Sequence, residues 1–250
     1  MSDTSANIVE LFSSIQGEGL FVGFRQIFLR FSECNLSCTY CDTDSSETPL
    51  YANIEGTAGR RDFSQVVNPV SLERIVGLLN RWERGLPGIH HSLSLTGGEP
   101  LLQHDILLTW LPELKKHLPI YLETNGVLNS ALFSLIEHLD YIAMDIKLPS
   151  TSGCTQLWDD HRAFLATAAQ KNVFVKAVIG AETEAWEIIK ACEIICNVDV
   201  AIPLVLQPVT RKNGAIGIAP LKVLEFQEIA SRYLGEVRVI PQTHKFIGQL

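Results

Sequence analysis

Strand-like and helix-like segments alternate along most of the chain, and this alternation limits the possible folds more than any other feature of the sequence. Short apolar runs predict strands at 26–31, 91–96, 119–124, 140–147, 173–179, 200–208 and 236–240. Helical patterns lie between them at 71–85, 104–118, 130–139, 155–171, 182–196 and 221–233. Strands that alternate with helices of this length form βαβ units around a mainly parallel sheet.

The number of units narrows the fold further. Six or seven βα units are too few for a closed eightfold barrel, so the expected class is α/β, as a partial barrel or as an open wound sheet. We expect one domain over residues 1–250. Its one long irregular stretch is predicted at 42–70, an insertion that either serves the function or is a tolerated surface loop.

Composition excludes several classes of protein. Hydrophobic residues make up 46% and charged residues 19% of the chain, which is typical of a globular rather than a disordered protein. The apolar run at 200–206 is far shorter than the ~18 residues of a membrane helix, and the N-terminal residues do not resemble a secretion signal. A net charge of −8 disfavours direct binding of nucleic acid. We therefore expect a cytoplasmic protein without membrane or nucleic-acid partners that acts on a small molecule.

Three cysteines carry the strongest chemical signal. Cys34, Cys38 and Cys41 have the spacing C-x3-C-x2-C and directly follow the strand predicted at 26–31. Thiols this close in a cytoplasmic protein indicate metal binding or catalysis. Three thiolates on a four-iron cluster leave one iron open to a small chelator with an amine and a carboxylate, such as the methionine end of S-adenosylmethionine (SAM). The alternative is a zinc site completed by a His or Asp.

The cysteine spacing, with Tyr40 before the last cysteine, resembles the radical SAM superfamily. The resemblance implies a partial (β/α)6-type barrel with predominantly parallel strands. It also implies a [4Fe–4S] cluster on Cys34, Cys38 and Cys41 that reduces bound SAM. In that superfamily the reduction yields a 5′-deoxyadenosyl radical, which abstracts a hydrogen atom from the substrate.

A second motif, S-L-T-G-G-E-P at 94–100, ends the next predicted strand. Gly97 and Gly98 allow the backbone to approach a ligand closely, and Glu99 adds an acceptor. By the resemblance, this segment holds the amino group of SAM. The other residues expected to contact SAM are Tyr40 and Asp42 beside the cysteines, Glu123, Thr124 and Asn125 at the end of a strand, and Gln207 near the end of another.

Both ends of the chain resemble the 7-carboxy-7-deazaguanine synthase family. The N-terminal part carries Q-G-E-G at 16–19, then Arg30 and then C-D-T at 41–43, and the C-terminal part carries P-Q-T-H-K-F-I-G at 241–248. The resemblance implies a lyase that converts 6-carboxy-5,6,7,8-tetrahydropterin to 7-carboxy-7-deazaguanine with loss of ammonia. It also implies that SAM is used catalytically, that Mg2+ is required, and that the product feeds the biosynthesis of queuosine and related deazapurines.

The same resemblance implies which residues bind the substrate. Gln16 offers a donor and an acceptor to the pterin edge, Glu18 accepts N–H groups, and Arg30 matches the substrate carboxylate. Thr96 is expected to contact the substrate, and Thr43 to be the protein's oxygen ligand to Mg2+. The remaining substrate contacts implied are Ile15, Gly17, His244 and the terminal carboxylate of Leu250.

One segment departs from the family pattern. Many relatives carry S-P-K after the fourth strand, where the serine contacts SAM, but this chain has M-D-I-K-L-P-S at 144–150. Lys147 matches the lysine, and Asp145 stands where the serine would be. Ser150 is an alternative source of the SAM contact.

The resemblance also implies an electron donor such as flavodoxin or ferredoxin, and a homodimer. Two other functions stay open: another radical SAM enzyme, such as an activase that places a glycyl radical on a partner protein, and a non-catalytic zinc-binding or scaffold protein. Outside the cysteine motif, Cys192 and Cys196 are predicted to fill core space on one helix, and Cys154 carries no signal. His90 and His91 are expected to face solvent.

Overall fold

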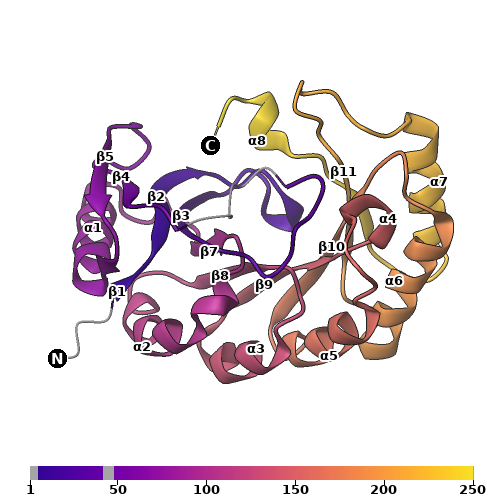
Figure 1. Ribbon diagram of the computed structural model, residues 1–250, viewed down its shortest axis with the longest axis horizontal. Helices are drawn as coiled ribbons and strands as arrows, with labels where there is room; N and C mark the ends of the chain where they lie inside the picture. Colours follow the sequence, from indigo (N-terminus) through magenta and orange to yellow (C-terminus); the bar gives the residue numbers. More distant parts are fainter. Residues whose placement is uncertain (1–4, 42–47, 250) are drawn as a thin grey trace.

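The molecule is built on a curved sheet whose outer side is covered by helices (Figure 1). The computed structural model describes residues 5–41 and 48–249. Within these ranges the main sheet has ten strands in the order β12-β11-β10-β9-β8-β7-β3-β2-β4-β5. They are β2 (Ile8–Ile15), β3 (Arg25–Phe31), β4 (Tyr51–Glu55), β5 (Phe63–Val67), β7 (Leu93–Gly97), β8 (Ile120–Thr124), β9 (Tyr141–Ile146), β10 (Asn172–Ile179), β11 (Leu204–Pro208) and β12 (Val237–Val239). A separate pair joins β1 (Ser5–Ala6) to β6 (Val70–Ser71).

The strands from β3 to β12 in this order run parallel to one another. The long helices are α1 (Leu72–Gly85), α2 (His104–Leu114), α3 (Asn129–Leu135), α5 (Trp158–Ala168), α6 (Ala185–Val198) and α7 (Pro220–Ser231). The short ones are η1 (Gly19–Phe21), η2 (Pro100–Gln103), η3 (Ile136–His138), α4 (Pro149–Ser152) and α8 (Thr243–Phe246). Six βα units and a final strand make a partial barrel, so the α/β class predicted from the alternation is confirmed.

Local sequence accounts for these elements. The hydroxyl of Ser71 caps α1 by accepting a hydrogen bond from the Arg74 amide at 3.4 Å. The side chains that α1 buries recur every three or four residues: Ile75, Leu78, Leu79 and Trp82. All residues of β11 are buried, as expected for a parallel strand covered on both faces.

The segment 42–70 is not the irregular insertion that the sequence predicted. Residues 42–47 lie outside the described residues, but β4 and β5 form an antiparallel hairpin, and β6 follows it. In β4, Ala52 and Ile54 are buried and alternate with exposed residues, the period of two of a half-buried strand. This alternation is hard to detect in the sequence because only two apolar side chains carry it.

No strand is predicted from the sequence before residue 26, yet β2 lies there, antiparallel to β3 and parallel to β4. The turn after β2 folds over the concave side of the sheet. Phe21 in this turn packs edge-on against Tyr121 and Tyr141, with ring centroids 5.4 and 4.9 Å away. This packing places the Q-G-E-G segment inside the curve of the sheet.

His90 is buried, which corrects the expectation that it faces solvent. Its Nε2 lies 2.9 Å from the Ser13 hydroxyl and its Nδ1 lies 2.8 Å from Glu83. Burial lowers the pKa of His90, so this network joins β2 to α1 through a neutral imidazole. No helix in the described ranges is long and apolar enough to cross a bilayer.

Candidate active site

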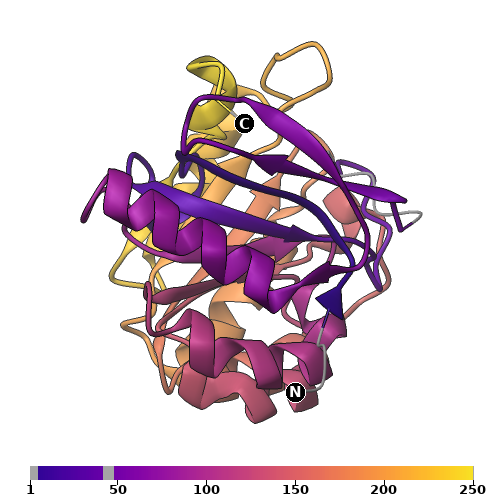
Figure 2. The same ribbon diagram turned by 90° about the vertical axis from the view of Figure 1, so that its left-hand side faces the viewer.

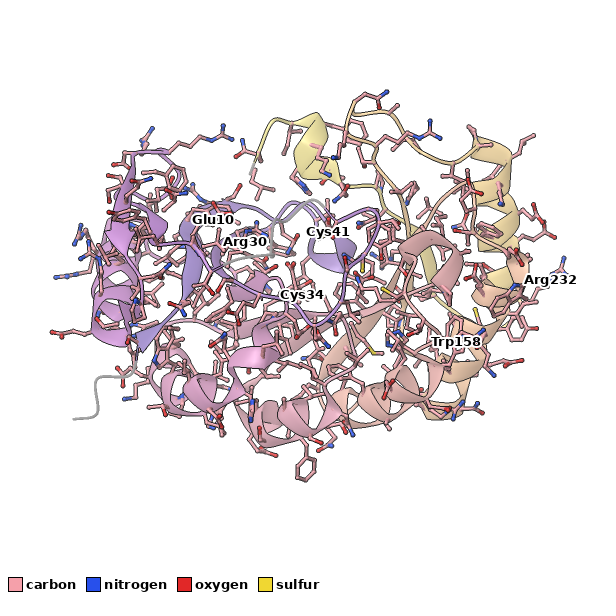
Figure 3. The ribbon with its side chains drawn as sticks, viewed as in Figure 1. Glu10, Arg30, Cys34, Cys41, Trp158 and Arg232 are labelled. Carbon is pink, nitrogen blue, oxygen red and sulfur yellow. The ribbon has the colours of Figure 1, made fainter. Side chains whose placement is uncertain are left out.

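A cavity of about 230 Å³ lies inside the curve of the sheet, beside the carboxyl ends of the parallel strands. Figure 3 shows Arg30, Cys34 and Cys41 in this inner region, whereas Arg232 points outward from the helical side. The predicted site residues that line the cavity are Ile15, Gln16, Gly17, Glu18, Arg30, Cys34, Cys38, Tyr40, Cys41, Thr96, Gly97, Gly98, Glu123, Thr124, Asn125, Gln207 and His244. Asp42, Thr43 and Leu250, which were also predicted, lie outside the described residues.

The loop that carries the cysteines is anchored on the glycine pair that ends β7. The amide of Gly98 donates to Phe31 O at 3.2 Å, and the amide of Glu99 donates to Glu33 O at 2.8 Å. A Cβ atom on Gly98 would lie 1.8 Å from Glu33 O. Gly97 has φ 123°, and its Cβ atom would lie 2.1 Å from Phe31 O. The glycines are therefore required for the approach of the cysteine loop to β7, whatever they contact in a ligand.

Glu99 was predicted to contact SAM, but it is fully buried beneath the cavity and does not line it. Its carboxylate accepts hydrogen bonds from Leu101 N at 3.1 Å, the Thr124 hydroxyl at 2.9 Å and Asn125 N at 2.7 Å. Burial raises the pKa of Glu99 to about 7 against the effect of these donors. Glu99 thus orients two residues that do line the cavity.

The thiols line the cavity as separate groups. Burial raises the pKa of Cys34 and raises that of Cys38 to about 12. Within the described ranges, no three Cys, His, Asp or Glu side chains gather closely enough to hold one metal ion. In a [4Fe–4S] cluster each thiolate binds a different iron, so its ligands need not meet at one point. Cys154, which had no signal in the sequence, lies with its sulfur 3.8 Å from that of Cys38.

One face of the cavity is a network of uncharged donors around Glu123. Its Oε1 accepts from Gln16 Nε2 at 2.8 Å and from the Ser94 hydroxyl at 3.2 Å, and its Oε2 accepts from the Thr96 hydroxyl at 2.9 Å. Gln16 Nε2 also donates to Gln26 at 2.9 Å. Glu123 was assigned to SAM by the sequence analysis, yet the structure joins it to two residues that were assigned to the substrate.

A second part of the lining carries buried charges. Lys176 of β10 forms an ion pair with Glu18 and lies 3.7 Å from Asp145, whose Oδ2 is 2.7 Å from Lys147 Nζ. Burial alone would raise the pKa of Glu18, but Lys176 and the hydrogen bond from Gln242 lower it to about 2. Glu18 is therefore an ionised acceptor at every physiological pH.

Arg30 and the C-terminal segment complete the lining. Arg30 Nε donates to Glu10 at 2.7 Å, which uses one of the five donors of the guanidinium. The amide of Thr243 donates to Gly17 O at 2.8 Å. His244 packs so closely on Gly17 that a Cβ atom there would lie 2.2 Å from its Nδ1. The Q-G-E-G segment and the C-terminal segment, more than 200 residues apart, thus meet at the cavity.

Several buried acceptors in the cavity lack a protein partner. Among the described residues, such atoms include Asn125 Oδ1, Asp145 Oδ1, Gln207 Oε1 and Thr210 Oγ1, and all four residues line the cavity. Buried polar atoms are nearly always hydrogen-bonded, so these four indicate a ligand rich in donors. SAM has an ammonium group, ribose hydroxyls and an adenine amino group, and it therefore fits this set of acceptors.

The alternative SAM contact at Ser150 is not supported. Its hydroxyl donates to Glu187, its amide donates to the same carboxylate at 2.9 Å, and Ser150 does not line the cavity. Asp145 lines the cavity instead. Sequence reasoning missed Lys176, although a lone charge within the apolar run V-F-V-K-A-V-I at 173–179 was a usable signal. It also missed Thr210, which follows β11 without any local pattern, and it gave no role to Gln242, although this residue lies in the P-Q-T-H-K-F-I-G segment at 241–248.

Comparison with known proteins shows the family of this chain. The sequence pattern of the "Radical SAM superfamily" matches residues 29–200. The chain is 59% identical to a 7-carboxy-7-deazaguanine synthase of Geobacter sulfurreducens, over 100% of both chains. It is 34% identical to a 7-carboxy-7-deazaguanine synthase of Archaeoglobus fulgidus, over 97% of this chain and 98% of that protein.

Solved structures share the fold. QueE from Escherichia coli matches with a TM-score of 0.59 and 19% identity, over 96% of this chain and 95% of that chain. A radical SAM methyltransferase from Sphaerobacter thermophilus matches with a TM-score of 0.55 and 13% identity, over 88% of this chain and 70% of that chain. These identities are too low to carry more than the fold.

Membership of the superfamily implies a [4Fe–4S] cluster and SAM as cofactors. The chain belongs to the radical SAM superfamily and, within it, to the family of 7-carboxy-7-deazaguanine synthases.

Proposed function

We propose that this protein is a carbon–nitrogen lyase that converts 6-carboxy-5,6,7,8-tetrahydropterin to 7-carboxy-7-deazaguanine with loss of ammonia. One observation carries the proposal. Gln16, Glu18, Arg30 and His244, from distant parts of the chain, line the same cavity as the three cysteines. The full-length identity to proteins named 7-carboxy-7-deazaguanine synthase supports it.

The polar groups of the cavity suit a pterin that carries a carboxylate. Glu18, ionised by its pairing with Lys176, accepts the N–H groups of the pterin edge. Gln16 is oriented through its Nε2 by Glu123 and Gln26. The guanidinium of Arg30 has four N–H donors beyond the one that binds Glu10, and these can hold the substrate carboxylate in a bidentate pair.

The cofactors occupy the other end of the cavity in this proposal. Cys34, Cys38 and Cys41 hold the [4Fe–4S] cluster, which together with SAM supplies the radical that abstracts hydrogen from the substrate. Asn125, Asp145 and Gln207 offer unpaired acceptors to SAM. Mg2+ on Thr43 is part of the proposal, and it rests on the C-D-T motif at 41–43 alone.

The size and lining of the cavity favour this function over a glycyl-radical activase. An activase must admit a segment of another protein, whereas a cavity of about 230 Å³ that is lined by residues from both ends of the chain suits one small substrate. A cytoplasmic location, an electron donor such as flavodoxin or ferredoxin, and a homodimer complete the proposal by analogy with the family.

An anaerobic assay tests the function. The reconstituted protein is mixed with SAM, dithionite, Mg2+ and 6-carboxytetrahydropterin, and the deazaguanine product is followed by absorbance and mass. We expect product from the wild type and none from Cys38→Ala or Arg30→Ala. Cleavage of SAM to 5′-deoxyadenosine without deazaguanine would refute the substrate. A protein that takes up no iron would refute the cluster.

A further inference from the structure

The β4–β5 hairpin has no role in the function proposed so far. It is the part of segment 42–70 that the sequence analysis could not assign. Because β4 runs parallel to β2, the loop that follows β4 lies beside the end of β2, where the Q-G-E-G segment begins. Figure 2 shows this hairpin close to the C-terminal end of the chain.

A buried carboxylate organises the hairpin loop. Glu55 is 1% exposed and accepts three backbone hydrogen bonds, from Ser13 at 2.9 Å, Gly59 at 2.9 Å and Arg61 at 2.7 Å. The loop is fastened a second time by Arg25, whose Nη2 donates to Ala58 O at 3.0 Å. The loop therefore has one conformation that is tied to both β2 and β3.

This loop conformation points the side chain of Arg61 toward the C-terminal segment. Arg61 has φ 57°, a left-handed conformation that a non-glycine residue adopts rarely and that its hydrogen bond to Glu55 stabilises here. Its guanidinium Nη2 donates to Gly248 O at 2.6 Å. Gly248 itself has φ 64°. Ser14 Oγ adds a longer contact of 3.4 Å to Gln249 Oε1.

The same C-terminal segment carries groups that line the cavity. Gln242 Nε2 donates to Glu18 at 2.7 Å, and His244 packs on Gly17. The segment from Gln242 to Gln249 is thus held at one end by the Q-G-E-G segment and at the other by Arg61. The helix between these anchors, α8, buries no side chain of its own. The anchor at Arg61 fixes the end of the segment that lies beyond α8.

We propose that the β4–β5 hairpin is a latch that holds the C-terminal segment over the substrate end of the cavity, with Arg61 as its positioning residue. The inference rests on the proposed function for the identity of the substrate, but the latch itself is a property of the chain. Arg61 does not line the cavity, so it acts through the position of His244 and Gln242.

Two measurements on the full-length protein test the latch, with Arg60→Ala as the matched control. Arg60 is exposed, adjacent and of equal charge. In Arg61→Ala we expect hydrogen exchange of the 243–249 amides to become about five- to tenfold faster, the size of one charge-assisted hydrogen bond at the surface. We expect KM for 6-carboxytetrahydropterin to rise by a similar factor, with KM for SAM unchanged. Arg61→Lys should give exchange rates and a KM for the pterin between those of Arg61→Ala and Arg60→Ala, because an ammonium group can still donate to Gly248 O.

Each possible result either supports or overturns the proposed latch. Unchanged exchange in Arg61→Ala, or equal changes in Arg61→Ala and Arg60→Ala, would overturn the latch. Faster exchange with an unchanged KM for the pterin would overturn its role in positioning. If the wild type makes no deazaguanine, the proposed function fails, and the exchange experiment still decides whether Arg61 holds the C-terminal segment.

Discussion

In the cavity, buried charged side chains lie beside side chains of opposite charge. Glu18, Lys176, Asp145 and Lys147 form a row of alternating sign that joins the turn after β2 to β10 and to the end of β9. An ion that loses its only partner in such a place costs several kcal/mol. The low pKa of Glu18, and with it the acceptor character of this carboxylate, is therefore a consequence of Lys176.

Replacing Lys176 should expose this dependence. In the wild type the pKa of Glu18 is about 2, so the carboxylate is ionised throughout the assay range. In Lys176→Met the burial remains and the cation is gone, so the pKa of Glu18 should rise above its usual 4.5. We expect kcat/KM for the pterin to fall at least tenfold and to acquire a new acidic limb, with activity declining as pH falls. Lys171→Met, directly before the same strand, should show neither effect.

Glu99 should make the free energy of unfolding depend on pH in the opposite direction, with stability declining as pH rises. Its folded pKa, about 7, lies above the ordinary value of 4.5. The contribution of Glu99 to the free energy of unfolding is therefore fully present below pH 4.5 and is lost as pH rises through 7. The loss is roughly 3 kcal/mol at most. Urea unfolding of wild type and Glu99→Gln at pH 5 and pH 7.5 measures this. The decline between the two pH values should be smaller in the variant, and equal declines would show that Glu99 is not the group responsible.

At the scale of elements, the cysteine loop depends on its contact with β7. Two backbone hydrogen bonds from Gly98 and Glu99 hold the loop, and the space at Gly98 admits no side chain. The motif that resembles a SAM-binding segment thus also fixes the position of the cluster ligands. The loop and the strand end behave as one unit.

Adding one methyl group at Gly98 should separate the cysteine loop from the end of β7. In Gly98→Ala the Cβ atom would lie 1.8 Å from Glu33 O, so the loop must move together with Cys34. We expect the iron and sulfide bound after anaerobic reconstitution to fall below about half of the wild-type content. Gly77→Ala is the control, because Gly77 lies in α1 with nothing within 4 Å of its Cβ position. It should load iron normally and be more stable by about 0.5–1 kcal/mol. Full loading of Gly98→Ala would contradict the proposed anchoring.

At the scale of the whole molecule, the cavity is assembled from both ends of the chain. The parallel strands supply its floor, the turn after β2 covers the concave face, and the C-terminal segment closes over it. The described residues of α8 bury no side chain, so this segment belongs to the site more than to the core.

Deleting residues 243–250 should therefore damage the site and spare the fold. We expect the melting temperature to change by no more than a few degrees, since no core packing is removed. Product formation should fall at least tenfold through a higher KM for the pterin, while calorimetry should show wild-type affinity for SAM. A variant that unfolds, or one that keeps its KM for the pterin, would show that the segment has a different role.

Much of the fold and the cluster motif could be predicted because their signals are local. The apolar runs of the parallel strands, the N-cap at Ser71 and the spacing of Cys34, Cys38 and Cys41 all lie within short windows of sequence. The hairpin of β4 and β5 escaped prediction because its two buried aliphatic residues leave too weak a period.

By itself the sequence determined the α/β class, the cysteine motif and the set of residues that resemble a substrate site. Only the tertiary structure decided how they work together. It paired Glu18 with Lys176, 158 positions later, turned Glu99 beneath the cavity, bonded Ser150 to Glu187, and brought Arg61 to Gly248. These contacts are non-local: each depends on which strands become neighbours and on which face a side chain occupies. A pairing between distant segments leaves no periodic trace in either of them, so the folded chain alone specifies it.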